Sequence, residues 1–397
     1  MRDVNSCPAC SSTDRELVCE FNGLALLAYL RGSPLCRYDY ALCRTCGLVF
    51  ATKRPNGNEV SWLYSRFDEF LGRTEEEQTG GRVSEITRDE REHLQRRLAR
   101  GWLVTEEGQL SEDEWMADVF DERVRNSFHA NLLGCLIPIE GKRILELRAT
   151  TGFMLDLLKR CYRAAEVIAM PMSERQVLVV HELNPMTTAL LDFETLEVPF
   201  EGTFDVILAR HMLTHAIEPL RLWQVLREKL KPGGYAYLYM ENDDRFLCER
   251  KRKNLFGEMK CFHFQSFDLP TFARVLRYQG LDPVFLRHPH SQHSEMLCLV
   301  RRDDAVRAQP MSRAEFESRL ALYRRWRDHS VLSLDEDFQS LFAGELAAIG
   351  ERALAAGDAT RDKVTGRTIA KKRLRLMHEE GYTKLNAGVN AVKEVGR

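Results

Sequence analysis

Three stretches of the chain decide the expected fold: RILEL at residues 143–147, EVIAM at 166–170 and FDVILA at 204–209. Each is a short apolar run of strand length, and the segments between them are long enough for helices. Two more runs of this kind, at residues 188–191 and 235–240, continue the alternation. Strands that alternate with helices predict an α/β domain built on a parallel sheet.

The chain continues past this sheet with two further strand patterns, at residues 283–287 and 296–300. A short connection that contains His288, His290 and His293 joins them, so we expect an antiparallel pair at one edge of the sheet. We interpret the three histidines as a polar edge loop in preference to a second metal site, because only Glu295 flanks them at ligand spacing.

Helical patterns lie on both sides of the α/β segment. Two capping boxes on the C-terminal side, Ser312-x-x-Glu315 and Ser333-x-x-Glu336, predict helices within residues 304–397. An apolar stripe from Phe338 to Ile349 indicates a buried helical face there. The charged stretch at residues 61–140 carries two more such boxes, and we interpret it as a helical linker or cover.

The N-terminal residues carry two C-x-x-C pairs, Cys7 with Cys10 and Cys43 with Cys46, and Gly47 follows the second pair. A two-residue spacer lets a tight turn direct both sulfurs to one point, and Gly47 can adopt the positive φ that such turns often need. Four thiolates at this spacing predict a closed, structural zinc site in a zinc-ribbon-like module over residues 1–60. Reduced core cysteines that only happen to have this spacing are the alternative.

Composition limits the classes of protein to which the chain belongs. With 397 residues, 44% of them hydrophobic, it buries a sizeable core in two or three domains. A net charge of -2, and no basic stripe with interleaved aromatic residues in residues 1–60, argue against nucleic acid as a partner. Eleven cysteines in a mainly metal-like pattern fit a reducing cytoplasm. No apolar run is long enough to span a bilayer, so we expect a cytoplasmic protein without membrane contact.

Three motifs carry a resemblance to a known family. Residues 204–215 read FDVILARHMLTH, KPGGY follows at 231–235, and HFQSFD begins at His263. This combination resembles the class I S-adenosylmethionine-dependent methyltransferases, and a zinc-binding N-terminus joined to such a domain is similar to the sugar C-methyltransferase group. The resemblance implies a Rossmann-like methyltransferase sheet over residues 141–303 and S-adenosylmethionine as the cofactor.

The resemblance also implies which residues bind the cofactor. Glu146 matches the carboxylate at the end of the first strand, and Gly152 matches a glycine of the turn that follows. Asp192 matches the acid after the third strand, near the adenine. His211 lies in a segment that borders the pocket in this family.

The cofactor motif is nevertheless degenerate. The family has glycines where this chain has Arg148 and Thr150, which add side chains where the ligand needs space and can forbid a positive φ. Met170 stands where the family places the acid that holds the ribose hydroxyls, and a thioether is a poor acceptor for them.

Two histidines are the catalytic candidates. His263 aligns with the last histidine of a proton-abstracting run in the sugar C-methyltransferases, and His215 is the second candidate. An imidazole suits a general base because its ordinary pKa lies near neutrality. A buried core histidine is the alternative reading of His263. His211 and His215, four residues apart, would share a helical face, where we expect packing or ligand contact in preference to a metal.

Two functions remain open at this point. The first is an active methyltransferase of small-molecule or sugar-derived biosynthesis, and the second is a non-catalytic pseudo-methyltransferase that serves as a binding or scaffold subunit. The expected partner is a small-molecule acceptor or a protein, a second copy of this chain included. Residues 361–397 carry ten Lys or Arg and four Asp or Glu, which indicates either a solvated tail or a segment that docks onto an acidic surface.

Overall fold

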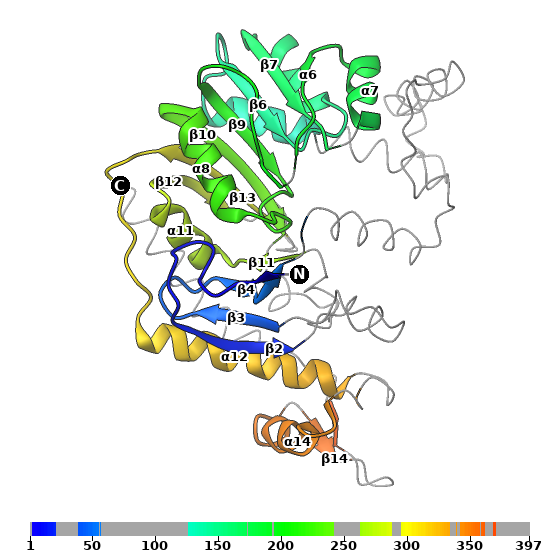
Figure 1. The fold of residues 1–397 in the computed structure, drawn as a ribbon, viewed down its shortest axis with the longest axis vertical. Coiled ribbons are helices and arrows are strands. Elements are labelled where there is room, and N and C mark those ends of the chain that lie inside the picture. Colours follow the sequence, from blue (N-terminus) through cyan, green and yellow to red (C-terminus); the bar gives the residue numbers. More distant parts are fainter. Residues whose placement is uncertain are drawn as a thin grey trace, which may run out of the picture. The chain divides into compact units, whose positions relative to one another are not determined.

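The computed structural model (Figure 1) describes residues 2–20, 39–54, 56, 126–172, 174–192, 194–241, 263–287, 295–333, 339, 342–357, 359–361 and 368–370. The three edge-loop histidines, most of the charged stretch at 61–140 and the basic residues at 371–375 lie outside these ranges. Within the described part, residues 126–136 are helical, as expected for the end of the linker.

The predicted α/β sheet is confirmed. Seven strands are hydrogen-bonded in the order β12-β13-β10-β9-β6-β7-β8. β6 pairs in parallel with β7 and β9, β7 pairs in parallel with β8, and β12 and β13 form the expected antiparallel pair. The strands span Arg143–Leu147 (β6), Glu166–Met170 (β7), Thr187–Thr188 (β8), Phe204–Arg210 (β9), Leu230–Glu241 (β10), Leu281–Arg287 (β12) and Glu295–Arg302 (β13).

The third strand is shorter than expected. The sequence predicts a strand at residues 188–191, whereas β8 covers only Thr187–Thr188. The chain still runs alongside β7, because Ala189 N donates to Ala169 O (3.2 Å) and Leu191 N donates to Pro171 O (2.7 Å). These bonds hold the segment in place without the regular strand geometry that β-branched residues favour.

Helices cover the parallel strands because the strands are apolar on both faces. Every residue of β6 and β7 after the first is buried. α6 (Phe153–Arg160) buries Met154, Leu155 and Leu158 and packs against β7. α7 (Glu174–Leu183) and α8 (Pro219–Lys229) complete the alternation of strands and helices.

The chain divides into two compact units. The first contains Met1–Tyr64, Leu213–Gln224 and Tyr239–Arg397, and the second contains Ser65–Met212 and Val225–Leu238. The four segments expected from the sequence, with boundaries after residues 60, 140 and 303, stay a prediction. None of the helices in the described ranges is both long and apolar enough to cross a membrane.

The N-terminal module of the first unit is an antiparallel sheet in the order β11-β4-β3-β2, and a two-stranded ribbon of β1 and β5 accompanies it. β2 and β3 pair in antiparallel orientation between the two cysteine pairs. The strands span Arg2–Asp3 (β1), Arg15–Glu20 (β2), Asp39–Cys43 (β3), Val49–Ala51 (β4), Lys53–Arg54 (β5) and Gln265–Ser266 (β11).

The C-terminal part is helical, as expected, with one correction. Ser312 caps α12 (Arg313–Leu332) by accepting a bond from Glu315 N (3.2 Å). Ser333 was expected to begin a helix but lies at the C-terminal cap of α12, where its N–H bonds Ser330 O and Val331 O. The remaining elements are α11 (Leu269–Tyr278), α14 (Leu346–Ala355) and an antiparallel pair, Ala359–Arg361 (β14) and Thr368–Ala370 (β15).

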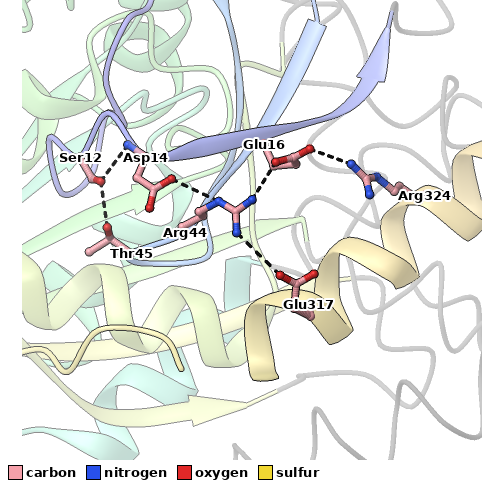
Figure 2. Close-up of polar contacts among 7 residues, drawn as sticks. All are labelled: Ser12, Asp14, Glu16, Arg44, Thr45, Glu317 and Arg324. Carbon is pink, nitrogen blue, oxygen red and sulfur yellow. Dashed lines mark hydrogen bonds and ion pairs between the residues drawn. The ribbon is translucent and has the colours of Figure 1, made fainter. Parts of the chain in front are cut away.

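α12 packs against the N-terminal module. Figure 2 shows Arg44, next to Cys43, between Glu16 Oε2 (2.8 Å) and Glu317 Oε1 (3.8 Å), while Arg324 reaches Glu16 Oε1 (2.8 Å). The Arg44 guanidinium also lies over the Phe316 ring, 4.2 Å from its centroid. These pairs are partly exposed, so each contributes little stability by itself, but they set the position of the helix on the sheet.

Candidate functional site

The four predicted metal ligands converge. The Sγ atoms of Cys7, Cys10, Cys43 and Cys46 all lie within 4.8 Å of one another. The Cys7–Cys46 and Cys10–Cys43 sulfurs are 3.5 Å apart, and all four cysteines are free of disulfides. A tetrahedral zinc site with Zn–S bonds of about 2.3 Å has sulfur–sulfur edges of about 3.8 Å. The arrangement therefore fits a four-thiolate site.

Two matching turns hold these cysteines. Ser11 N donates to Cys7 O (2.9 Å) in the first turn, and Gly47 N donates to Cys43 O (3.0 Å) in the second. Gly47 has φ +81, as the sequence predicts, and a Cβ there would lie 3.1 Å from Met311 Sδ. Glycine is thus required both by the backbone conformation and by the close approach of a neighbouring side chain.

Burial defines the chemistry of this cluster. Cys7, Cys43 and Cys46 are fully buried, and Cys10 is half-buried. Burial raises the pKa of the Cys7 thiol, and hydrogen bonding with Cys10 raises it further. A buried set of four thiolates therefore needs a cation to compensate its charge. Among the described residues the cluster contains no His or carboxylate and no fifth ligand, which fits a closed structural site better than a catalytic one.

A second cluster lies in the other unit, where β6 and β9 end. The order of the sheet reverses at β6, and in such sheets ligands bind outside the carboxyl ends of the strands at this point. Glu146 in β6 is 1% exposed, and its Oε1 accepts from Arg210 Nε (2.9 Å) and Nη2 (2.6 Å). Its Oε2 is buried and accepts no hydrogen bond from any residue in the described ranges. The carboxylate is thus paired on one side and has an unused acceptor on the other.

The loop after β6 keeps a left-handed backbone without the expected glycine. Arg148 has φ 61, which corrects the expectation that its side chain forbids a positive φ there, and Gly152 has φ 73. The Arg148 guanidinium donates to His211 O, and His211 also has a positive φ of 49. Arg148 therefore connects the loops that follow β6 and β9.

The other two predicted cofactor residues are placed differently. Met170 is fully buried in the sheet, so its thioether belongs to the core. Asp192 is exposed, and its Oδ1 accepts from Glu194 N (2.7 Å) and Thr195 N (3.3 Å), which makes it the first residue of a turn. The structure thus brings Glu146, Gly152 and His211 to neighbouring strand ends, together with two arginines.

The two catalytic candidates contact each other in the first unit. The rings of His215 and His263 have centroids 4.7 Å apart at 83°, and both residues are less than a tenth exposed. Phe264 N donates to Thr214 O (2.8 Å), and Tyr40 OH donates to His263 O (2.8 Å). The pair is therefore held by backbone bonds on both sides.

His211 and His215 do not share a helical face. Residues 211–217 form turns and no helix, so the expectation of four-residue helical spacing is wrong. The helix begins only after these residues, at Pro219, the first residue of α8, a position that proline favours.

Sequence reasoning missed Arg210 and Arg54. Arg210 is the last residue of β9, whose carboxyl end lies where the sheet order reverses. Ligands bind at such strand ends, so its position could have marked Arg210 as a candidate. Arg54 gave no signal, because it lies between Lys53 and Pro55 in a short basic stretch that is typical of exposed residues.

Comparisons with known proteins agree with this fold. Residues 120–285 match the family model described as a methyltransferase domain. The ubiquinone biosynthesis O-methyltransferase of Albidiferax ferrireducens is 24% identical over 116 residues, which are 28% of this chain and 46% of that protein. The enzyme of the same name from Vibrio cholerae is 28% identical over 102 residues, 24% of this chain and 41% of that protein. The chain thus spans less than half the length of the curated relatives it matches.

Similar solved structures are more distant. A putative methyltransferase in complex with the Trm112 activator from Haloferax volcanii is 15% identical, with a TM-score of 0.39, over 49% of this chain and 100% of that chain. A Mesorhizobium loti S-adenosylmethionine-dependent methyltransferase is 17% identical, with a TM-score of 0.37, over 43% and 96%. The match of residues 120–285 to the methyltransferase domain model, the strand order and the motifs agree with a class I S-adenosylmethionine-dependent methyltransferase fold.

Proposed function

We propose that the chain is an S-adenosylmethionine-dependent methyltransferase that acts on a small molecule, with a structural zinc ion in its N-terminal module. One observation carries the proposal. Arg148 and His211 are both non-glycine residues with a positive φ, and they are bonded to each other at the strand ends where ligands bind in such sheets. Strained backbone of this kind costs about 1–3 kcal/mol per residue and concentrates at functional sites.

The residues at these strand ends fit an S-adenosyl ligand in part. Glu146 Oε2 is a buried acceptor without a partner and is suited to a hydroxyl or ammonium group of the ligand. Gly152 keeps the left-handed turn that lets a ligand approach the backbone, and His211 borders the same place. S-adenosylmethionine supplies an electrophilic methyl group when it is bound.

The histidine pair supplies the proton chemistry in this proposal. One of the two histidines, His215 or His263, takes a proton from the methyl acceptor. The other imidazole ring keeps that histidine oriented through the edge-to-face contact. Methyl transfer depends mainly on an in-line approach, so positioning contributes much of the rate and the demands on the base are modest.

The zinc proposal rests on the thiolate geometry described above. Zinc would contribute binding free energy directly to the folding of the module, because it would compensate the charge of four thiolates that lie mostly buried in one cluster. A small-molecule acceptor is the expected partner, and assembly with a protein or with a second copy of the chain remains a proposal to be checked by light scattering.

Calorimetric titration of the zinc-loaded full chain with S-adenosylmethionine and S-adenosylhomocysteine tests the cofactor proposal. We expect both to bind, with S-adenosylhomocysteine binding more tightly, because its neutral sulfur avoids repulsion by Arg148 and Arg210. Absence of heat and of thermal stabilisation with either ligand, in the wild type and in Arg148→Gly, would refute it.

A non-catalytic pseudo-methyltransferase is the second candidate, and a specific observation favours it. The charge of Glu146 is already paired with Arg210, and the Arg148 side chain occupies the place of a family glycine. In that case ligand binding is absent in the wild type and the domain serves as a binding surface. The same titration separates the two candidates.

A further inference from the structure

Arg54, in β5 of the N-terminal module, is a buried arginine whose guanidinium is only partly used. Its side chain is 4% exposed, and Nη1 donates to Ile217 O at 2.9 Å. Nε and Nη2 are buried and have no hydrogen-bond partner among the described residues. Arg54 thus holds the segment that follows β9 with one nitrogen and leaves the other two unsatisfied.

The two unused nitrogens form one edge of the guanidinium. Nε–H and one Nη2–H point in nearly parallel directions, and this edge binds a carboxylate or phosphate through two bonds. The chain contains an example of the same mode, since Arg210 uses Nε and Nη2 to hold Glu146. The orphaned atoms of Arg54 are therefore the pair that recognises an oxyanion.

Among the residues that the structure describes, no acid is paired with this edge. Arg2 lies opposite Arg54 in the β1–β5 pair, and the nearby Glu218 forms its ion pair with Arg2. Burial, and then the charge of Arg2, lower the pKa of Arg54 to about 9, so the group is still a cation at neutral pH. A buried cation without a counter-ion is destabilising, and an anion bound there would offset that cost.

The position of Arg54 relates it to the histidine pair. The carbonyl that it holds, Ile217 O, is two residues past His215. Gln265 holds the start of the same segment through Leu213 O, and its own Oε1 is buried without a partner. Gln265 is two residues past His263. Each histidine is therefore two residues from either the carbonyl that Arg54 holds or Gln265 itself. Both Arg54 and Gln265 have buried polar atoms not used in hydrogen bonds to the described residues.

We propose that the Nε–Nη2 edge of Arg54 binds an oxyanion, a carboxylate or a phosphate, carried by the small-molecule acceptor. This inference rests on the proposed function, because it assigns the acceptor a negative group near His215. In it, the zinc module supplies a substrate-recognition residue as well as a folded N-terminus. Gln265 Oε1 offers an acceptor for a hydroxyl or amide of the same molecule.

The test uses the zinc-loaded full chain with inorganic phosphate and, separately, acetate as probes, against chloride at equal ionic strength. Thermal melting and calorimetry are measured for the wild type, Arg54→Gln and Arg54→Lys, with Arg160→Gln on the exposed face of α6 as the control for general charge effects. We expect either phosphate or acetate to bind saturably and to raise the melting temperature in the wild type and in Arg160→Gln. Arg54→Gln should lose it, and Arg54→Lys, which keeps the charge but not the two-bonded edge, should bind at least tenfold more weakly.

The probes also distinguish the sources of the oxyanion, because a phosphate site prefers phosphate and a carboxylate site prefers acetate. An oxyanion response no larger than that of chloride, or an equal response in Arg54→Gln or Arg54→Lys, overturns the inference. Arg54→Lys provides the comparison if Arg54→Gln does not fold. S-adenosylhomocysteine is titrated into the same samples. If it binds but no oxyanion response is seen, the oxyanion site is refuted and the proposed function is not. If an oxyanion response is seen but S-adenosylhomocysteine does not bind, the proposed function is refuted and the oxyanion site is not.

Discussion

The ion pair between Asp268 and Arg319 provides the sharpest test of how the zinc module and α12 depend on each other. Their side chains are 4% and 5% exposed, and an Arg319 Nη1–Asp268 Oδ2 contact joins them. Arg319 Nη2 also donates to Gly47 O (3.3 Å), directly after the last cysteine. Asp268 Oδ1 caps α11 by accepting from Thr271 N (2.8 Å). One pair therefore connects the second cysteine turn, α11 and α12.

The expected magnitudes follow from this burial. Arg319→Met leaves a buried carboxylate with only the capping bond, and loss of one partner of a buried pair costs about 3–5 kcal/mol of unfolding free energy. Asp268→Asn keeps the cap, since asparagine is also a good N-cap residue, but leaves the arginine unpaired at a cost of about 3 kcal/mol. The double variant removes both charges, so its cost should fall below the sum of the single costs by about 3 kcal/mol.

The measurement is a double-mutant cycle by urea unfolding of the zinc-loaded chain, combined with the rate of zinc release to a chelator. Zinc release is a local probe, and it is needed because a chain of two units need not unfold in one step. Each single variant should release zinc faster than the wild type, and the double variant should recover part of the difference. Additivity within about 0.5 kcal/mol, or wild-type zinc release in Arg319→Met, would show that the pair does not couple α12 to the metal module.

Three further predictions concern the metal, the cofactor loop and pH. We expect close to one zinc per chain by elemental analysis, with a lower melting temperature after chelation and in Cys43→Ser; less than half an equivalent without chelator contradicts the site. Arg148→Gly should tighten S-adenosylmethionine binding by about tenfold or more, because it removes a side chain from the turn and a charge of the same sign as the ligand's sulfonium. Arg163→Gly is the matched control, since Arg163 also has a positive φ, of 57, so an equal gain there would assign the effect to backbone strain. Burial acts to raise the pKa of Asp205, but the hydrogen bond from Lys231 (2.8 Å) and the N–H of Arg143 outweigh it, so the pKa lies below its ordinary value. The stability contributed by ionised Asp205 is present above its unfolded pKa of about 3.9 and is lost as pH falls through its lower folded pKa. The difference in unfolding free energy between the wild type and Asp205→Asn should therefore shrink below about pH 4. A difference that stays constant from about pH 7 to about pH 3 excludes a stabilising charge at Asp205.

The burial of Met170 argues against replacing it with the family's acid to improve cofactor binding. An acid at position 170, suggested by the family pattern, would place a charge at a fully buried side chain in β7. Arg148→Gly alone is the informative change, because it removes a side chain and relieves a left-handed residue without burying new charge.

Local patterns in the sequence determined most of the architecture. The bounds of β6 and β7, the antiparallel pair of β12 and β13, the cap at Ser312 and the convergence of four cysteines all followed from periodicity, capping and spacing. Such features depend on residues close in the chain, or on a metal-ligand spacing that few other structures satisfy. The sequence was less informative where a segment needs a neighbour to define it, as at β8 and at Ser333.

Only the tertiary structure decided the chemistry of the two sites. The interactions that define these sites join residues 48 to 163 positions apart along the chain. They are Glu146 with Arg210, Arg148 with His211, His215 with His263, and Arg54 with Ile217. Charge compensation, burial and left-handed backbone at these positions arise from packing between distant segments, and no local pattern encodes them. For this reason the sequence by itself predicted the family, while the charge of each site, and hence its preferred ligand, depended on the fold.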